Sequence, residues 1–220
     1  MKIVCIHFKG GVGKSTTAIH VVGILSGLSG QKTLLVDGDR QVTSYSFFNN
    51  GNPPSHDEEL FFSSVISIIP LQTVQTSNAQ EMGKRLRKVS KIKCDHLVVD
   101  TTPDPATTNL ILAELAPDLI LIPVKLDDQG SHSQLTPLLK TIARMAAFGV
   151  NPRVKLIPLG GGANNIDPYA NDAGMAYSVT TSIPLMHKEF GDAVYKEFRY
   201  VWELDGCSAI YDTYREIVWE

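Results

Sequence analysis

The chain has 220 residues, which is long enough to bury a sizeable core and within the range that one α/β domain commonly fills. Lysine and arginine number 20 against 23 aspartates and glutamates, which excludes a general attraction of the whole chain to nucleic acid or to an anionic membrane. Three widely separated cysteines, Cys5, Cys94 and Cys207, lack metal-ligand spacing and suit reduced thiols in the cytosol.

Short apolar runs rich in β-branched residues alternate with helical patterns along the chain. The runs are Ile3–Phe8, Thr33–Val36, Val65–Ile69, His96–Val99, Leu119–Val124 and Val154–Leu159. Such alternation is typical of βα units around a parallel sheet, and runs that are apolar at consecutive positions indicate helices on both faces. The sequence therefore predicts one α/β domain over residues 1–220, with a mostly parallel twisted sheet flanked by helices.

Two segments near the start of the chain have distinct local patterns. Residues 14–30 carry apolar residues at helical spacing, and Gly30 is placed to end that helix. Residues 47–59 are polar and rich in turn formers, so they are interpreted as an exposed loop. The apolar start, Met1 to Phe8, is interpreted as a buried strand and not as a signal peptide. No stretch reaches the roughly 20 apolar residues that a membrane span requires.

The segment between the first strand and the first helix has the composition of a phosphate-binding loop. In this setting, backbone N–H groups of the turn and of the helix amino end can converge on phosphate oxygens. Lys14 would place its ammonium on the β and γ phosphates, and the Ser15 hydroxyl can coordinate Mg²⁺. We therefore expect ATP and Mg²⁺ as ligands. The predicted nucleotide-binding residues of this loop are Lys9, Gly10, Gly11, Val12, Gly13, Lys14, Ser15 and Thr16.

The loop departs from the usual P-loop pattern G-x-x-x-x-G-K-[ST], because Phe8 stands at the first glycine position and Lys9 follows it. Here the chain resembles the ParA/MinD family of deviant Walker A ATPases, whose signature K-G-G-x-G-K-[ST] matches residues 9–15 at every fixed position. Residues 36–41 are similar to the family's D-x-D-P-Q segment, with Arg40 in place of the common proline.

Further motifs extend the resemblance along the chain. Residues 97–103 are similar to the family's Walker B strand and D-T-P-P turn, and residues 121–124 are similar to its following strand. Ile183-Pro184 is similar to a short element near the base pocket. The clear similarity covers about residues 1 to 130, with a fainter trace toward the carboxyl terminus. It implies a P-loop NTPase that hydrolyses ATP.

The resemblance implies roles for individual residues. Lys9 reaches across a dimer interface to the partner's phosphates, and Asp39 orients the attacking water, so Lys9, Lys14 and Asp39 form the catalytic set. Asp37 lies close to the metal or its waters, next to Ser15. Asp100 ends a buried strand beside the loop and can hold Mg²⁺ through water, the alternative being a cap for the turn that follows it.

At the level of the whole protein, the resemblance implies a slow ATPase that acts as a switch. ATP favours a homodimer, and loss of the γ phosphate releases it. A ParB-like adaptor would stimulate hydrolysis, and the protein would segregate or position a cargo along nucleoid DNA. The expected cargo is a plasmid or chromosome origin, and protein cargos such as carboxysomes are the alternative.

A run of basic residues is the candidate contact for non-specific DNA. Residues 84–93 contain six lysines and arginines and no acid. At helical spacing four of them share a face, and each phosphate contact from it would add salt-dependent affinity. The four are Lys84, Arg87, Lys88 and Lys91. A solvated helix face is the alternative. A second candidate set lies near the carboxyl terminus, interleaved with aromatics that favour core or dimer contacts: Lys188, Lys196, Arg199 and Arg215.

Other classes of function are weighed against this one. A MinD-like membrane role requires a basic amphipathic terminal helix, and residues 212–220 are acidic on balance. A metabolic P-loop enzyme is a further alternative, since one fold hosts many chemistries. For the adenine, Asn164 or Asn165 after the triple glycine is the candidate contact, the alternative being a surface loop. His132 and His187 are expected to be solvated.

Overall fold

The structure is a computed structural model that describes residues 1–28, 30–54, 60–71, 79–161, 166 and 174–220. Its strands are β1 (Lys2–Cys5), β2 (Thr33–Asp37), β3 (Leu60–Phe61), β4 (Ile66–Pro70), β5 (His96–Asp100), β6 (Leu119–Lys125), β7 (Arg153–Leu159) and β8 (Ser178–Val179). Its α-helices are α1 (Lys14–Ser26), α2 (Thr43–Phe48), α3 (Ala79–Val89), α4 (Pro105–Leu115), α5 (Gln129–Met145), α7 (His187–Asp192) and α8 (Ala209–Trp219).

The described strands form one sheet in the order β3-β4-β2-β5-β1-β6-β7-β8. Every pairing is parallel except that of β3 with β4. The mostly parallel sheet predicted from the sequence is therefore confirmed, and each predicted apolar run overlaps a strand. The predicted first strand extends too far, because β1 ends at Cys5, although the Ile6 N–H still bonds to the Leu121 carbonyl.

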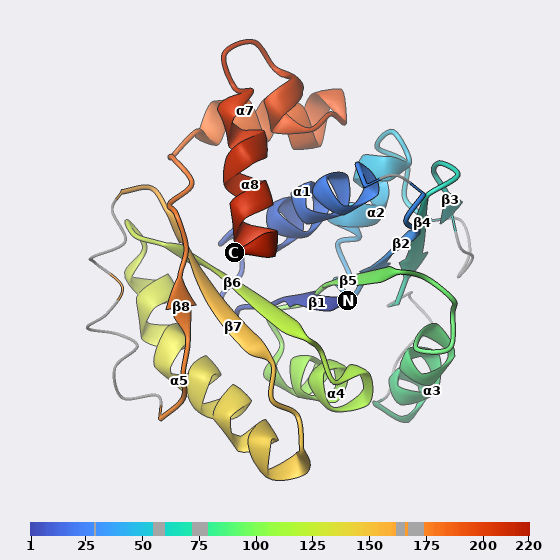
Figure 1. Cartoon of the computed structure of the whole chain (residues 1–220), viewed down its shortest axis with the longest axis vertical. Coiled ribbons are helices and arrows are strands. Elements are labelled where there is room, and N and C mark those ends of the chain that lie inside the picture. The colour runs from blue at the N-terminus through green and yellow to red at the C-terminus, as the bar shows by residue number, and fades with distance from the viewer. Residues whose placement is uncertain (29, 55–59, 72–78, 162–165, 167–173) are drawn as a thin grey trace.

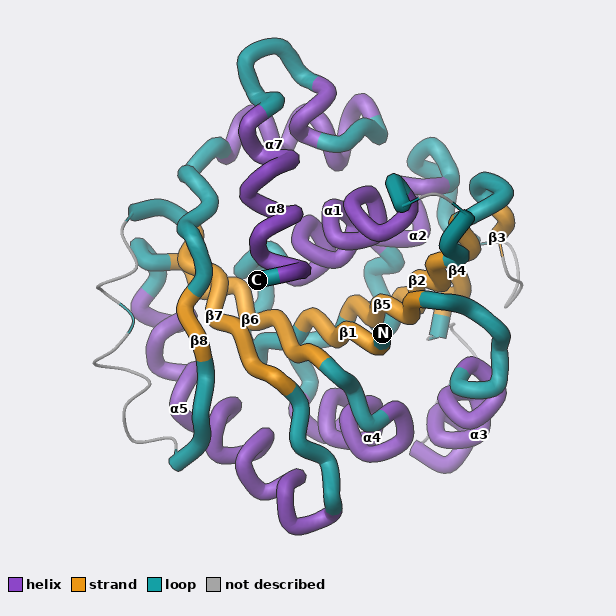
Figure 2. The backbone as a smooth tube through the Cα atoms, viewed as in Figure 1, coloured by secondary structure: helices purple, strands orange, loops and turns teal. Residues whose placement is uncertain are grey.

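Helices cover both faces of the sheet, as Figure 1 and Figure 2 show. Helices α1, α2, α7 and α8 lie over one face, and α3, α4 and α5 lie over the other. The side chains of successive strand residues point to opposite faces of the sheet. Ile3 and Cys5 belong to the core cluster under α1 and α8, whereas Val4 and Ile6 belong to the cluster under α4 and α5. This alternation follows from the period of two of a β-strand and explains why the strands are apolar throughout.

Two sequence-based expectations about local structure are wrong. Helix α1 ends at Ser26 with Gly27 as its C-cap, ahead of the predicted stop at Gly30. The segment interpreted as an exposed loop begins inside α2, and Phe47 and Phe48 are buried against the core. Their rings contact each other and Tyr200, a partner far along the chain that no local pattern reveals.

The register of β2 and β5 determines the geometry at the carboxyl edge of the sheet. It places Asp37 opposite Asp100, and the Gly38 N–H donates to the Asp100 carbonyl at 2.8 Å. A Cβ at Gly38 would lie 2.7 Å from that carbonyl oxygen, which is a backbone atom and is not free to move aside. Glycine is therefore required here by close backbone approach and not by a left-handed conformation.

A buried histidine joins α1 to the carboxyl-terminal segment. The Nδ1 of His20 lies 2.7 Å from the Thr16 carbonyl, and its Nε2 accepts the Val201 N–H at 3.0 Å. The ring stacks on Tyr214 at a centroid distance of 4.9 Å. Burial lowers the pKa of His20 to about 4, so the ring is neutral and uses one nitrogen as donor and the other as acceptor.

The contact at Gly38 predicts the effect of adding one methyl group. We expect Gly38→Ala to lower the free energy of unfolding by about 1–3 kcal/mol, because the new Cβ must push β2 and β5 apart. Gly191→Ala is the matched control, since a methyl group added at this position of α7 would meet no atom within 4 Å and alanine favours a helix. Denaturant unfolding measures both changes, and equal stability of the two variants would contradict the steric argument.

The neutral state of His20 predicts a pH dependence of stability. The pKa of His20 falls from 6.5 to about 4 on folding, so its contribution is complete above pH 6.5 and is lost as the pH falls toward 4. We expect the stability difference between wild type and the non-titrating His20→Gln variant to shrink by about 2 kcal/mol between pH 7.5 and pH 5. Unfolding curves at several pH values test this, and a constant difference would contradict it.

Candidate nucleotide-binding site

The predicted phosphate loop forms a tight turn between β1 and α1. Gly11 and Gly13 adopt left-handed conformations with φ of 75° and 90°, which residues with side chains rarely adopt. Gly13 is the N-cap of α1 and offers no side chain to cap the first-turn N–H groups. Those N–H groups therefore face the turn as donors for an anion. Val12 is fully buried, so it anchors the loop, and it also lines the pocket beside the loop.

The two lysines of the loop have different environments. Lys14 is only 5% exposed, and its ammonium donates to the Lys9 carbonyl at 3.2 Å. Burial lowers the pKa of Lys14, whereas the carboxylates of Asp100 and Asp39 act in the opposite direction. Lys9 lies at the rim of the loop, where its side chain packs over Gly130 at the amino end of α5. One lysine thus points into the turn, and the other lies along its edge.

A histidine that the sequence argument did not consider fixes the start of the loop. The Nδ1 of His7 accepts the Lys9 N–H at 3.0 Å, and the ring is fully buried. Burial lowers the pKa of His7 to about 4, and the charge of Lys14 acts in the same direction. The neutral ring therefore holds the backbone of Lys9 in place. Its position two residues before the loop lysine is a signal that sequence reasoning could have used.

The structure brings the three predicted aspartates to the same edge of the sheet as Lys14. Asp37 is fully buried, and its two oxygens accept the N–H groups of Asp39 and Tyr45 at 3.0 and 2.8 Å. Burial, followed by the charge of Asp100, raises the pKa of Asp37 well above its usual value. Asp39 is partly exposed, and one of its oxygens accepts the Gln41 N–H at 3.1 Å. Asp37 thus organises the loop that carries Asp39.

Asp100 has the free acceptor that a hydrated cation requires. One carboxylate oxygen accepts the Ser44 hydroxyl at 2.6 Å, and the other is buried without a hydrogen-bond partner among the described residues. Burial raises the pKa of Asp100, and the hydroxyls of Ser44 and Ser15 act against this rise. The turn after β5 is capped by Asp104, which accepts the Thr107 N–H. The arrangement of Ser15 and Asp100 fits Mg²⁺, which is held by oxygen ligands and waters.

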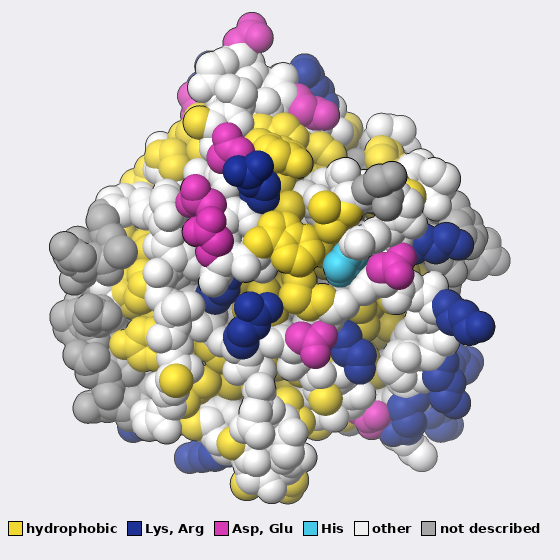
Figure 3. Space-filling model, in the orientation of Figure 1, with side chains coloured by type: hydrophobic (Ala, Val, Ile, Leu, Met, Phe, Trp, Pro, Cys, Tyr) yellow, Lys and Arg dark blue, Asp and Glu magenta, His cyan; other side chains and the backbone are white. Residues whose placement is uncertain are grey.

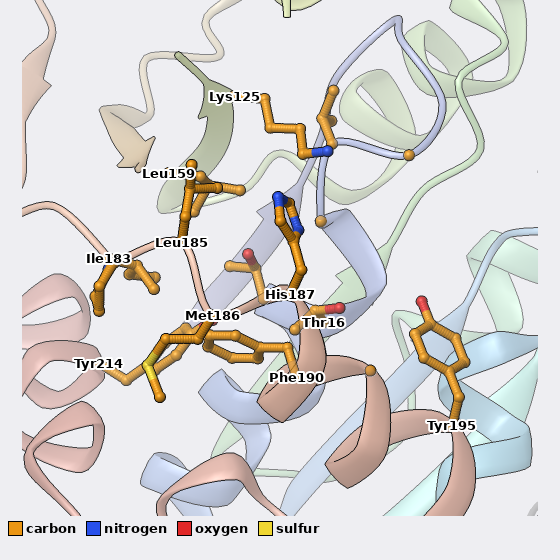
Figure 4. Close-up of a pocket in the computed structure, with 16 residues that line it drawn as sticks. Thr16, Lys125, Leu159, Ile183, Leu185, Met186, His187, Phe190, Tyr195 and Tyr214 are labelled. Carbon is orange, nitrogen blue, oxygen red and sulfur yellow. The ribbon is translucent and has the colours of Figure 1, made fainter. Parts of the chain in front are cut away.

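A pocket of about 220 Å³ opens beside the phosphate loop, and Figure 4 shows its lining. Gly11, Gly13 and Thr16 form one wall. The apolar wall consists of Leu159, Ile183, Pro184, Leu185, Met186 and Phe190. Such a slot next to a phosphate loop can take the ribose and flat base of a nucleotide. The sequence similarity at Ile183-Pro184 therefore marked a segment that does line this pocket.

Polar groups in the pocket come from residues that sequence reasoning missed. In Figure 4, Lys125 at the end of β6 and His187 at the start of α7 both point into the pocket. Tyr195, which is 59% exposed, lines the opposite side. His187 thus lies in a candidate site, where only solvation was expected, and His132 is buried with its Nε2 3.1 Å from the Lys125 carbonyl. Asn164 and Asn165, the predicted adenine contacts, lie outside the described residues.

The two predicted basic regions differ in the acids around them. We define the α3 basic surface as five exposed residues at the end of α3 and in the turn after it: Lys84, Arg87, Lys88, Lys91 and Lys93. Helix α3 ends at Val89, so Lys91 lies beyond the helix and not on its face as predicted. Arg87 pairs with Glu114, and the four lysines have no ion pair with any described residue. Figure 3 shows basic side chains gathered over α3.

The carboxyl-terminal basic residues are paired with acids. Lys196 pairs with Asp192, Arg215 with Asp212, and Arg199 with both Glu197 and Glu203. Two of the aromatics between them pack against the core as predicted, since Tyr200 and Trp202 stack on each other and pack against His20, whereas Tyr195 is exposed. None of the described helices is both long enough and apolar enough to cross a membrane.

Comparison with known proteins places this geometry in a family. Residues 3–168 match the model of the CobQ/CobB/MinD/ParA nucleotide binding domain. The chromosome partitioning protein ParA of Myxococcus xanthus (strain DK1622) is 30% identical over 182 residues. That match covers 70% of this chain and 62% of the relative, so the chain spans less than two thirds of that protein's length.

Solved structures share the fold over nearly the whole chain. Apo McdA from Cyanthece superposes with a TM-score of 0.77 at 19% identity, covering 99% of this chain and 98% of its own. A putative plasmid partition protein from Borrelia burgdorferi B31, bound to AMPPNP, superposes with a TM-score of 0.69 at 17% identity, covering 99% and 97%. At these identities the likeness concerns the fold alone. The family match over residues 3–168, with the deviant loop at residues 9–15, shows that the chain belongs to the ParA/MinD family of nucleotide-binding proteins.

Proposed function

We propose that this protein is a slow ATPase that works as a switch: two subunits close around ATP and Mg²⁺ through their phosphate loops, and the dimer binds DNA without sequence preference. On nucleoid DNA it segregates or positions a cargo, with a ParB-like adaptor that stimulates hydrolysis. The cargo we favour is a plasmid or chromosome origin, because the curated relative is a chromosome partitioning protein.

The observation that carries the proposal is that the two lysines of the loop occupy different positions. Lys14 is buried and points into the turn, where it serves the phosphates of its own subunit. Lys9 lies at the rim, with its backbone fixed by His7 and its side chain over Gly130. A cation at the rim is placed to meet phosphates from a second subunit, where it offsets charge that develops on the transferred phosphoryl group.

Three carboxylates at the carboxyl edge of the sheet are suited to ATP hydrolysis. Asp39 is partly exposed and sits on a loop that Asp37 holds through the Asp39 N–H. This leaves Asp39 to orient a water toward the γ phosphate. Ser15 and the unpartnered oxygen of Asp100 would hold Mg²⁺, and Asp37 would lie near its waters. When bound, the metal neutralises charge on the phosphates. The pocket that Lys125 and His187 line would take the base.

Removal of the rim lysine should abolish the dimer and not nucleotide binding. We expect Lys9→Ala to stay monomeric with ATP and Mg²⁺ while wild type doubles its mass, as measured by light scattering. Lys2→Ala is the matched control, because Lys2 lies at the opposite edge of the sheet and bonds to the Leu115 carbonyl. Full dimerisation of Lys9→Ala would overturn the proposed role of Lys9 in the partner's site.

Removal of the proposed water-orienting carboxylate should slow ATP hydrolysis and leave ATP-dependent dimerisation intact. We expect Asp39→Ala to dimerise with ATP and to hydrolyse it at least about 100-fold more slowly, because general base or water positioning typically contributes that much. Phosphate release under single-turnover conditions measures the rate, and light scattering measures the dimer. A hydrolysis rate within about twofold of wild type would show that another group orients the water.

A further inference from the structure

Lys9 is held at two points, one on its backbone and one on its side chain. Its N–H donates to the Nδ1 of His7 at 3.0 Å, and the His7 ring is fully buried. Its side-chain stem lies over Gly130, because a Cβ added there would come within 3.0 Å of the Lys9 Cε and 3.5 Å of the Lys9 Cδ. Two segments far apart in the sequence therefore determine where the Lys9 ammonium points.

The first support, His7, fixes the backbone of Lys9 independently of nucleotide. The Lys9 carbonyl also accepts a bond, at 3.2 Å, from the Lys14 ammonium. That ammonium is the group we assign to the phosphates, so the bond to His7 is the one that does not involve a nucleotide-binding side chain. Burial lowers the pKa of His7 to about 4, which keeps the ring neutral and its Nδ1 available as an acceptor.

The second support, Gly130, provides space for the stem of Lys9. Gly130 is the second residue of α5, and its φ lies outside the left-handed region, so its backbone conformation does not require glycine. Glycine weakens a helix relative to alanine. What glycine provides here is the space that the Lys9 stem fills, since an added Cβ would meet only the Lys9 side chain and, at 3.0 Å, the Asp128 Oδ1.

The start of α5 is itself fixed to the sheet. The Ser131 hydroxyl accepts the Lys125 N–H at 3.1 Å, and the His132 Nε2 lies 3.1 Å from the Lys125 carbonyl. Lys125 ends β6, which pairs with β1 in the sheet, and His7 lies two residues after the end of β1. Both supports of Lys9 therefore extend from neighbouring strands, and their spacing is set by the sheet.

We propose that His7 and Gly130 are positioning residues for Lys9, which together direct its ammonium toward phosphates bound by a second copy of this chain. This inference rests on the proposed function, in which Lys9 completes the partner's site. Lys14 serves the phosphates of its own subunit. Disturbing either support therefore weakens the ATP dimer and leaves nucleotide binding by the single subunit unchanged, because a small misplacement of a charged group lowers its contribution steeply.

Gly130→Ala separates the direction of Lys9 from the stability of the fold. The added methyl group meets the flexible end of a lysine and favours the helix, so the thermal unfolding midpoint should stay equal or rise. We expect dimerisation with ATP and Mg²⁺ to weaken at least about tenfold, as measured by light scattering over a protein concentration series. Affinity for fluorescently labelled ADP should stay within about twofold of wild type, because only Lys9 is displaced.

The matched control is Gly83→Ala, the same change inside α3. The nearest atoms to a Cβ at Gly83 lie at 3.5 Å or more, which is ordinary contact. Gly83→Ala should dimerise and bind ADP like wild type. A weakened dimer in this control would show that the loss in Gly130→Ala does not come from Lys9.

Two substitutions at His7 test the backbone support. The side-chain oxygen of His7→Asn can take the place of Nδ1 and accept the Lys9 N–H, so this variant should dimerise within about threefold of wild type. His7→Leu keeps an apolar side chain in the buried position and removes the acceptor. We expect its dimer to weaken at least about tenfold with unchanged ADP affinity. Thermal unfolding midpoints confirm that both variants are folded.

Lys9→Ala separates failure of this inference from failure of the proposed function. Full dimerisation of Lys9→Ala would overturn the proposed function. A dimer that depends on Lys9 but forms normally in Gly130→Ala and in His7→Leu would overturn the positioning role alone. An equal loss of ADP affinity in these two variants would also overturn it, because the supports would then serve the phosphate loop of their own subunit.

Discussion

The site depends on the parallel pairing of β2 with β5, which places the buried carboxylates of Asp37 and Asp100 side by side. Burial removes hydration from both groups and raises both pKa values; the charge of Asp100 adds to the rise for Asp37, and the charge of Asp39 adds to the rise for Asp100. The fold offsets this cost with directed donors: two backbone N–H groups bond to Asp37, and the Ser44 hydroxyl bonds to Asp100. Lys14 adds a nearby positive charge. One oxygen of Asp100 has no hydrogen-bond partner among the described residues.

That arrangement gives the two carboxylates different tasks. Both carboxylate oxygens of Asp37 accept backbone N–H groups, from Asp39 and from Tyr45. Asp37 therefore acts by holding Asp39 in position. Asp100 and Asp39 each keep an oxygen that can serve a metal or a water. The hydrogen bonds give a physical reason for separate roles of Asp37 and Asp39, because both oxygens of Asp37 accept backbone N–H groups, whereas one oxygen of Asp39 accepts the Gln41 N–H. Burial alone would not have distinguished Asp37 from Asp100, since both are fully buried.

The parts of the structure that were predictable are those with local causes. Consecutive apolar residues specify strands covered on both faces, and a glycine-rich turn before a helix specifies the phosphate loop. Contacts between distant segments were not predictable in this way. Phe47 and Phe48 lie in a stretch of turn formers, and they are buried because Tyr200 covers them. Lys125 and His187 reach one pocket from β6 and α7, because Lys125 lies opposite Leu159 of β7, and Leu159 bridges to Ile183 ahead of α7.

The nucleotide site and the α3 basic surface lie at opposite edges of the sheet, the carboxyl edge and the amino edge. This separation limits how a bound nucleotide can affect binding at the α3 basic surface. Strand β5, which lies between them, is buried along its whole length; Asp100 ends this strand, whereas Lys91 and Lys93 lie in the turn before it. A γ phosphate therefore has no short path to the α3 basic surface within one subunit.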